Sequence, residues 1–423
     1  MRGVSAVSVD RSTGSLLVDG RKVFPIVLSN APPLGARAPG GGDALAEVAA
    51  GGANFIRAGR ADWSLDSLDR QVAAERRLLD AAAANDLHCW LQLGNVPDLP
   101  DKGLSTREQL LTSLVGQLKD HPALGAWKGV DEPANPNRPA RVPAAGLERA
   151  YRKLKALDPA HPVVITQAPL GTLAQLVPYR PAFDITGADI YPVSYPPGKH
   201  AGRGNRDIGV VGSVTQKMMR AAGDKPVWIT LQVAWSGVIP SQQHPNNVPR
   251  FPTLQQERFM AYQAIVHGAR GLAFFGGHLT QIARPADAKL GWNWTYWNRV
   301  LQPLLGELTS ASVAPALTAP SARRAVKAGA AGVETATRVA GDFLYVIAVR
   351  RGSGTSRVSF SGLPSRRNGR PITGGEVLFE YEQEPLPPPI QPDRQTFRTV
   401  GAANGRFRDW LGQHDVRIYR FRR

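Results

Sequence analysis

The sequence predicts an α/β protein: a (β/α)₈ TIM barrel followed by a C-terminal antiparallel β-sandwich domain. Eight short apolar segments alternate with helical segments over roughly the first 300 residues, which is typical of a barrel of parallel strands. The pattern changes to strict two-residue alternation after a Pro- and Ala-rich stretch at 312–322. The chain of 423 residues is long enough to hold both units. We therefore expect two domains, residues 1–310 and residues 311–423.

The barrel region begins with a β-hairpin. Residues 14–30 carry an Asp19-Gly20 turn between two apolar runs, and the second run leads into the first barrel strand. The other seven strands are expected at 53–59, 88–95, 123–130, 162–169, 183–193, 225–235 and 271–277. Helices are expected at 43–52, 68–86, 105–121, 144–158, 254–269 and 297–311. Ser105 with Glu108 three residues later predicts a capping box at the third of these helices.

The C-terminal region alternates apolar and polar residues in four segments. They lie at 342–351, 357–364, 375–382 and 415–423. A two-residue period places successive side chains on opposite faces of a sheet. These segments predict the antiparallel strands of the second domain.

The formal net charge of +17 raises the question of an anionic partner. Residues 321–423 hold 18 Arg or Lys residues against 9 Asp or Glu residues. The cations are scattered among strands and form no basic helix and no aromatic-interleaved patch, so we expect no nucleic acid as partner. A solvated basic surface is the simplest interpretation, and an anionic polysaccharide or a cell-surface glycan is the alternative.

Other segments bound the location and the chemistry. No run of 18 uncharged apolar residues occurs, so we expect no membrane span, and the first 20 residues lack the apolar core of a signal peptide. The single Cys89 lies in an apolar strand and excludes an internal disulfide. No HExxH, paired His or calcium loop is present, so neither a metal nor a cofactor is expected.

Candidate site residues follow from the barrel fold, because such barrels place their active sites at the carboxyl ends of the strands. The residues at those ends are amides, carboxylates and aromatics, which suit the hydroxyl groups and flat ring faces of a sugar. The candidates for substrate binding are Asn30, Arg57, Asn95, Gln167, Asp189, Tyr191, Gln232, Trp235 and His278.

Glu132 is the strongest catalytic candidate. It is the only glutamate before residue 300 that lies outside the predicted helices, and it follows the fourth strand in the stretch Asp131-Glu132-Pro133. A partly enclosed carboxylic acid there can protonate a leaving oxygen. The alternative is that these three residues only start a helix, with an acidic cap and Pro133 in its first turn.

The chain resembles the (β/α)₈ glycoside hydrolases of the β-galactosidase and cellulase type over about residues 18–310. The resemblance rests on "VDGRKVFPIVLSN", "GANFIRAG", "LGAWKGVDEP", "GADIYPV", "KPVWITLQ" and "HGARGLAFFG". It implies that Glu132 is the acid/base residue and that Asp131 replaces an Asn that contacts the sugar 2-hydroxyl. It also implies an extracellular or periplasmic location after removal of a signal peptide, with the cytoplasm as the alternative.

One position departs from that family. Its retaining members carry a nucleophilic Glu near the end of the seventh strand, where this chain has Leu231 and Gln232. Three interpretations stay open: Asp131 and Glu132 act as a pair on a 2-acetamido sugar, Glu132 acts with a second carboxylate such as Asp189, or the protein binds glycan without cleaving it. We expect a glycosidase that cleaves an oligo- or polysaccharide with Glu132 as general acid/base, and the alternative is a catalytically silent carbohydrate-binding TIM barrel.

Overall fold

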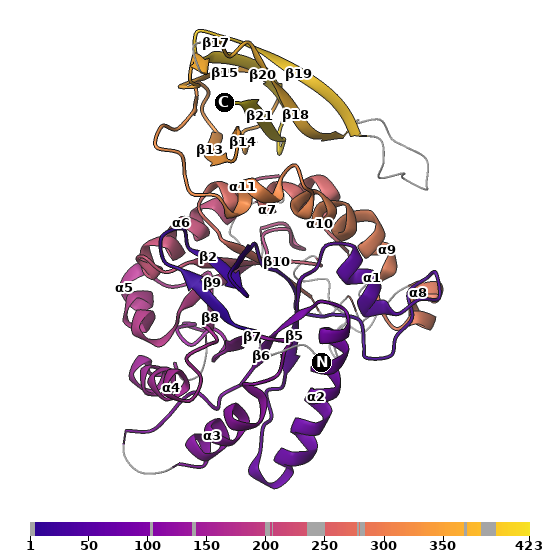
Figure 1. Ribbon diagram of the computed structural model, residues 1–423, viewed down its shortest axis with the longest axis vertical. Helices are drawn as coiled ribbons and strands as arrows, with labels where there is room; N and C mark the ends of the chain where they lie inside the picture. The colour runs from indigo at the N-terminus through magenta and orange to yellow at the C-terminus, as the bar shows by residue number, and fades with distance from the viewer. Residues whose placement is uncertain are drawn as a thin grey trace.

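The structure is a computed structural model of the 423-residue chain (Figure 1). It describes residues 5–101, 105–137, 141–198, 204, 206–234, 250–276, 279, 284–367, 370–381 and 395–423.

Eight parallel strands close into a barrel in chain order. They are β4 (Ile26–Leu28), β5 (Phe55–Gly59), β6 (His88–Gln92), β7 (Leu124–Lys128), β8 (Val163–Gln167), β9 (Ile185–Ile190), β10 (Val227–Gln232) and β11 (Gly271–Phe275). The pairing of β11 with both β10 and β4 completes the circle. All eight predicted barrel strands are confirmed.

Helices surround the barrel (Figure 1). They are α1 (Ala44–Ala50), α2 (Leu68–Ala84), α3 (Thr106–Leu118), α4 (Ala144–Leu157), α5 (Leu173–Leu176), α6 (Val210–Ala222), α7 (Leu254–Val266), α8 (Pro285–Leu290), α9 (Trp294–Tyr296), α10 (Gln302–Thr309) and α11 (Ala314–Thr318). Short 3₁₀ helices lie at η1 (Leu65–Ser67) and η2 (Val177–Ala182), and η4 (Trp297–Leu301) is a short π-helix. The Ser105 cap is confirmed, since its side chain accepts from the Glu108 amide. Helix α6 was not predicted. In the described part of the chain, no helix is both long and apolar enough to cross a membrane.

An N-terminal three-stranded sheet closes the end of the barrel at which the parallel strands begin, called the lower end below. Strands β1 (Val7–Asp10), β2 (Ser15–Val18) and β3 (Arg21–Val23) pair in order, and the predicted Asp19-Gly20 turn has positive φ angles of 49° and 76°. Val7 and Leu16 pack against inward-facing residues near the starts of the barrel strands, such as Phe55. Solvent is thus excluded from the amino ends of the strands, and the other end stays available for a site.

The C-terminal domain is one antiparallel sheet curved around its own core. Its order is β12 (Lys327–Ala328), β15 (Ser356–Ser361), β20 (Arg406–Leu411), β19 (Gln395–Ala403), β18 (Gly374–Tyr381), β21 (Val416–Arg422), β14 (Phe343–Arg350) and β13 (Val333–Ala340), beside the small pair β16 (Arg366–Arg367) and β17 (Arg370–Pro371). The ring centres of Phe407 on β20 and Phe421 on β21 lie 5.0 Å apart, although two strands separate β20 from β21 in the sheet. The sheet must therefore curve to bring these rings together. The predicted antiparallel domain is confirmed, and the boundary at residues 310–311 stays a prediction.

Helix α7 joins the two units. It is buried on all sides because it lies between the barrel and the C-terminal sheet (Figure 1). The Arg258 guanidinium bonds the Glu307 carboxylate at 2.8 Å and donates to the carbonyl oxygens of Val416 and Phe379. Arg258 and Glu307 are both buried, so each charge depends on the other for compensation.

Gly187 lies where strands β9 and β10 approach each other closely. A Cβ atom at this position of β9 would lie 1.5 Å from the Trp228 carbonyl oxygen on β10. We expect Gly187→Ala to abolish soluble folding or to lower the melting temperature by about 10 °C or more. Gly116→Ala is the control, because a Cβ there meets nothing within 4 Å in an exposed helix position, and it should leave stability equal or slightly raised. Equal melting temperatures for both variants would contradict so close an approach of β9 to β10.

Arg258→Gln should destabilise the protein by about 3–5 kcal/mol in a denaturant titration, because it leaves the Glu307 carboxylate buried without its guanidinium. The control is Arg152→Gln, which removes an exposed pair with Glu148 and should cost about 0.5 kcal/mol or less. A similar small loss for both variants would show that Glu307 does not depend on Arg258.

Candidate functional site

Inward-facing side chains form two layers along the barrel strands. The lower layer is apolar and includes Val27, Phe55, Trp90, Ala126, Val164, Ile185, Trp228 and Ala273. Because side chains alternate along a strand, the next inward position lies two residues further on. At that position seven strands carry Ser29, Arg57, Gln92, Lys128, Thr166, Thr230 and Phe275. Strand β9 has Gly187 there, and its first polar inward side chain is Asp189, two residues further on. The inner surface of the barrel thus changes from apolar to polar at one level.

A cavity of about 330 Å³ opens above this change. Every barrel strand, or the residue that follows it, contributes to the lining. The lining residues are Ser29, Arg57, Trp90, Gln92, Lys128, Asp131, Glu132, Thr166, Asp189, Tyr191, Thr230 and Phe275. Three carboxylates and two cations therefore share one small space.

Lys128 and Asp131 form an ion pair in the cavity wall. The Lys128 side chain is 6% exposed, and its Nζ lies 2.5 Å from Asp131 Oδ1 and 5.4 Å from the centre of the Trp90 ring. A buried ammonium requires such compensation. The opposite charges of Lys128 and Asp131 thereby compensate each other within the site.

Glu132 is held at the cavity edge by its backbone and by one neighbour. Its φ angle is +45°, a left-handed conformation that costs a residue with a side chain about 1 kcal/mol or more. Its amide donates to the Thr166 carbonyl at 2.8 Å, and Asn135 Nδ2 donates to Glu132 Oε2 at 2.7 Å. These bonds orient the carboxylate that the sequence selected.

The surroundings of Asp189 move its pKa far from the usual value of an aspartate. Burial, together with the negative charges of Asp131 and Glu132, raises its pKa to about 7, although the Tyr191 hydroxyl and the Lys128 ammonium act in the opposite direction. Tyr191 Oη donates to Asp189 Oδ2 at 2.7 Å. Burial and Asp189 also hold the pKa of Tyr191 well above its usual value, so this hydroxyl stays a donor. Asp189 thus carries a proton over part of the neutral pH range.

Arg57 faces the cavity with its guanidinium. Burial lowers its pKa, the nearby Asp131 counteracts this, and the guanidinium carbon lies 5.9 Å from the Phe275 ring centre. Within the described residues, the guanidinium has no hydrogen bond and no ion pair within 4.0 Å. Its five N–H donors are available to a ligand.

The structure brings together five of the residues selected from the sequence: Arg57, Asp131, Glu132, Asp189 and Tyr191. The helix-start alternative for residues 131–133 is wrong. These residues form a turn, and α4 begins only at Ala144, after Pro143.

Four other candidates do not line the cavity. Gln167 has the strand parity of Ile165, one residue off the inward Thr166, and it is buried. The Gln232 amide is consumed by the backbone of Val193 and Ala234. Asn30 and Asn95 lie past the strand ends, where Asn30 Oδ1 accepts from the Gly276 amide and Asn95 is exposed in a turn. Trp235 and His278 lie outside the described residues.

The sequence reasoning missed several lining residues, chiefly Lys128, Gln92 and Trp90. The missed signal was strand parity, since each of them lies at an inward position of its strand. Trp90 is 3% exposed, and its Nε1 has no hydrogen-bond partner among the described residues although the residue lines the cavity. A buried N–H without a partner costs about 1–3 kcal/mol of stability.

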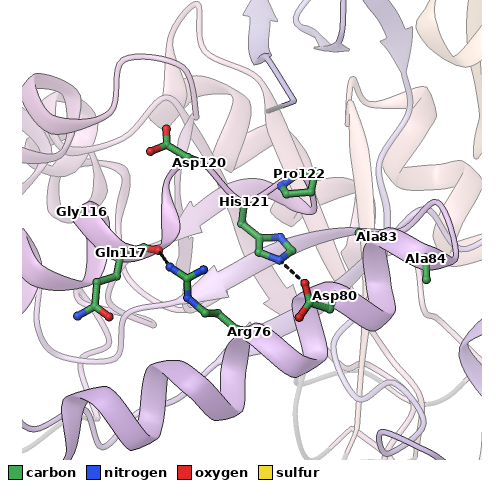
Figure 2. Close-up of a pocket in the computed structure, with 9 residues that line it drawn as sticks. All are labelled: Arg76, Asp80, Ala83, Ala84, Gly116, Gln117, Asp120, His121 and Pro122. Carbon is green, nitrogen blue, oxygen red and sulfur yellow. Dashed lines mark hydrogen bonds and ion pairs between the residues drawn. The ribbon is translucent and has the colours of Figure 1, made fainter. Parts of the chain in front are cut away.

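A second, larger hollow of about 640 Å³ lies at the opposite end of the barrel, between the ends of α2 and α3 (Figure 2). His121 bonds Asp80 at 3.0 Å, and Arg76 donates to the Gln117 carbonyl. Asp80 and Asp120 are exposed, and their carboxylates do not converge on a common position in the hollow (Figure 2). This end of such a barrel contributes to stability rather than catalysis, so volume does not identify the site here.

Comparison with known proteins supports the fold. No family model matches the chain, and no curated protein matches it. Among solved structures, the chain is similar to a glycoside hydrolase family 5 protein from Bacteroides vulgatus, with a TM-score of 0.64 at 12% identity over 99% of this chain and 93% of that chain. A structure described as a glycoside hydrolase gives a TM-score of 0.63 at 13% identity over 99% and 97% of the two chains.

An α-amylase from Geobacillus thermoleovorans, complexed with acarbose, gives a TM-score of 0.54 at 11% identity over 95% of this chain and 100% of that chain. At identities this low, the structural similarity shows the fold alone, and any activity has to be inferred from the residues of the cavity. The chain has the fold of the TIM-barrel glycoside hydrolases, with the additional β domain included in the similarity.

Proposed function

We propose that this protein is a glycoside hydrolase that cleaves an oligo- or polysaccharide in the cavity at the carboxyl ends of the barrel strands. The observation that carries the proposal is the convergence of Glu132 and Asp189 on one cavity, with the pKa of Asp189 raised to about 7. Glycosidic bonds are commonly cleaved by two carboxyl groups, one that protonates the leaving oxygen and one that acts as base or nucleophile.

Glu132 and Asp189 divide the acid/base work in this proposal. The resemblance assigned proton donation to Glu132. The raised pKa of Asp189 favours the opposite division, because the group that retains its proton near neutral pH is the better acid. Asp189 then protonates the leaving oxygen, and Glu132, oriented by Asn135, acts as the base or nucleophile.

The rest of the lining suits a sugar that carries acidic groups. Tyr191 and Phe275 stack with ring centres 6.1 Å apart and offer an apolar wall to a sugar ring. The guanidinium of Arg57 matches the geometry of a carboxylate. We propose an anionic polysaccharide as the substrate and, because such polymers are encountered outside the cell membrane, an extracellular or periplasmic location.

The seventh strand supports a second candidate, a glycan-binding protein without catalysis. Its carboxyl end offers Thr230 to the cavity and uses the Gln232 amide for backbone bonds, so it supplies no carboxylate. Acetamido-assisted hydrolysis by Asp131 and Glu132 is less favoured, because Lys128 already occupies Asp131 Oδ1. Substrate panels that include 2-acetamido sugars distinguish these candidates from the two-carboxylate scheme.

Glu132→Gln should lower kcat/KM on aryl glycosides by roughly 10²–10⁴-fold, for dinitrophenyl and for less activated leaving groups alike, because the lost carboxylate acts on the anomeric carbon or on water. Asp189→Asn should spare dinitrophenyl glycosides relative to the less activated ones, since a good leaving group needs no proton. Glu148→Gln on the outer helix α4 is the control and should change the rate less than about twofold. Full activity in Glu132→Gln would refute its role, and glycan binding without any hydrolysis would favour the silent binder.

The pH profile tests which carboxyl group donates. With Asp189 as the acid, kcat/KM requires its protonated form and falls as the pH rises through about 7. If Asp189 instead had to be ionised, kcat/KM would fall as the pH decreases through the same value. Rates measured from pH 5 to 9 therefore decide between the two divisions, and Asp189→Glu controls for loss of the group itself.

A further inference from the structure

The outward face of strands β15 and β20 carries an unusual set of side chains. Along β20 the exposure alternates strictly, with Arg406, Arg408 and Trp410 exposed and the residues between them buried. The register places Trp410 opposite Arg357 and places Arg408 and Arg406 opposite Ser359 and Ser361. All six side chains therefore lie on the same outward face of the sheet, which we call the β15–β20 face.

Trp410 is the most exposed large hydrophobic residue in the described part of the chain, at 58%. An indole left in water on a rigid strand is a candidate contact for an apolar ring face. The strand beneath it is fixed, because the inward Asp409 carboxylate accepts from Arg398 and from the Tyr419 hydroxyl. Trp410 thus stands on a preformed support.

The cations of the β15–β20 face have no counterions among the residues that the structure describes. Arg357, Arg406 and Arg408 form no hydrogen bond or ion pair through their side chains with any of them, and the exposed Lys327 on the adjacent β12 is likewise unpaired there. Within the same part of the chain, no acidic side chain lies on the outward face of β12, β15 or β20. By contrast, Arg398, Arg417 and Arg420 of the same domain all pair with carboxylates.

We propose that the β15–β20 face is a second carbohydrate site, which binds a polysaccharide with anionic groups. Trp410 stacks on a sugar ring, the three arginines bind the acidic groups, and Ser359 and Ser361 offer hydroxyls to the ring substituents. A single-stranded nucleic acid would favour several aromatics along a basic groove, and the β15–β20 face has one exposed aromatic residue, Trp410. β15 and β20 lie on the side of the domain away from the barrel (Figure 1), so this face is separate from the cavity. The proposal does not depend on hydrolysis.

The test is affinity electrophoresis of the whole chain through gels that contain polygalacturonate, with neutral dextran gels as reference. We expect retardation by polygalacturonate that weakens with salt. Trp410→Ala, and separately Arg406→Gln with Arg408→Gln, should each raise the dissociation constant about fivefold or more, while Trp410→Phe retains most of the binding. Melting temperatures equal to wild type verify that the variants fold.

The matched control is Arg70→Gln with Arg77→Gln, which removes the same charge from exposed positions of α2. It should leave the dissociation constant within about twofold. Equal losses in the control and the face variants would reduce the binding to net charge and overturn the proposal. So would retardation that is unchanged in Trp410→Ala, or binding through this face of DNA or of anionic lipid vesicles but not of polygalacturonate. Rates on small aryl glycosides should be unchanged in the face variants, which separates this test from that of the proposed hydrolysis.

Discussion

The closure of eight parallel strands into a barrel is the constraint on which the rest of the structure depends. Closure directs every second side chain inward, where neighbours from all strands share one level. An apolar layer that includes Phe55, Trp90 and Trp228 fills the lower interior and is sealed by the N-terminal sheet. Polar residues can then appear only one level higher, where the cavity opens. The position of the site is a consequence of packing before it is a matter of chemistry.

The chemistry of the cavity follows from how its charges compensate one another. Lys128 neutralises Asp131 by direct contact, whereas Arg57 remains without a close partner in the described structure. Asp189 is buried and lies near two other carboxylates, Asp131 and Glu132. Both factors disfavour its charged form and raise its pKa, so the proton is retained. The proposed acid/base catalysis rests on this raised pKa of Asp189 and on the second carboxyl group, Glu132, in the same cavity.

The order of the strands and the position of Glu132 at the cavity could be predicted because they depend on local patterns: apolar runs, and the one glutamate before residue 300 that lies outside the predicted helices. Lys128 and Gln92 could not be found without strand parity, which depends on where each strand starts. Gln232 was selected wrongly as a ligand contact, because its amide bonds the backbone of Val193 and sequence does not reveal such a long-range partner. Strand β20, which carries Trp410, is not among the segments predicted from the sequence, where the buried Asp409 interrupts the alternation of polar and apolar residues.

The most direct test of the central claim is a carboxyl titration of the free protein by ¹³C NMR, with wild type and Asp189→Asn compared. The account predicts one carboxyl resonance that titrates near pH 7 in wild type and is absent from the variant. If the resonance that Asp189→Asn removes titrates below about pH 5 in wild type, Asp189 does not hold a proton near neutrality. The division of roles between Asp189 and Glu132 would then be contradicted.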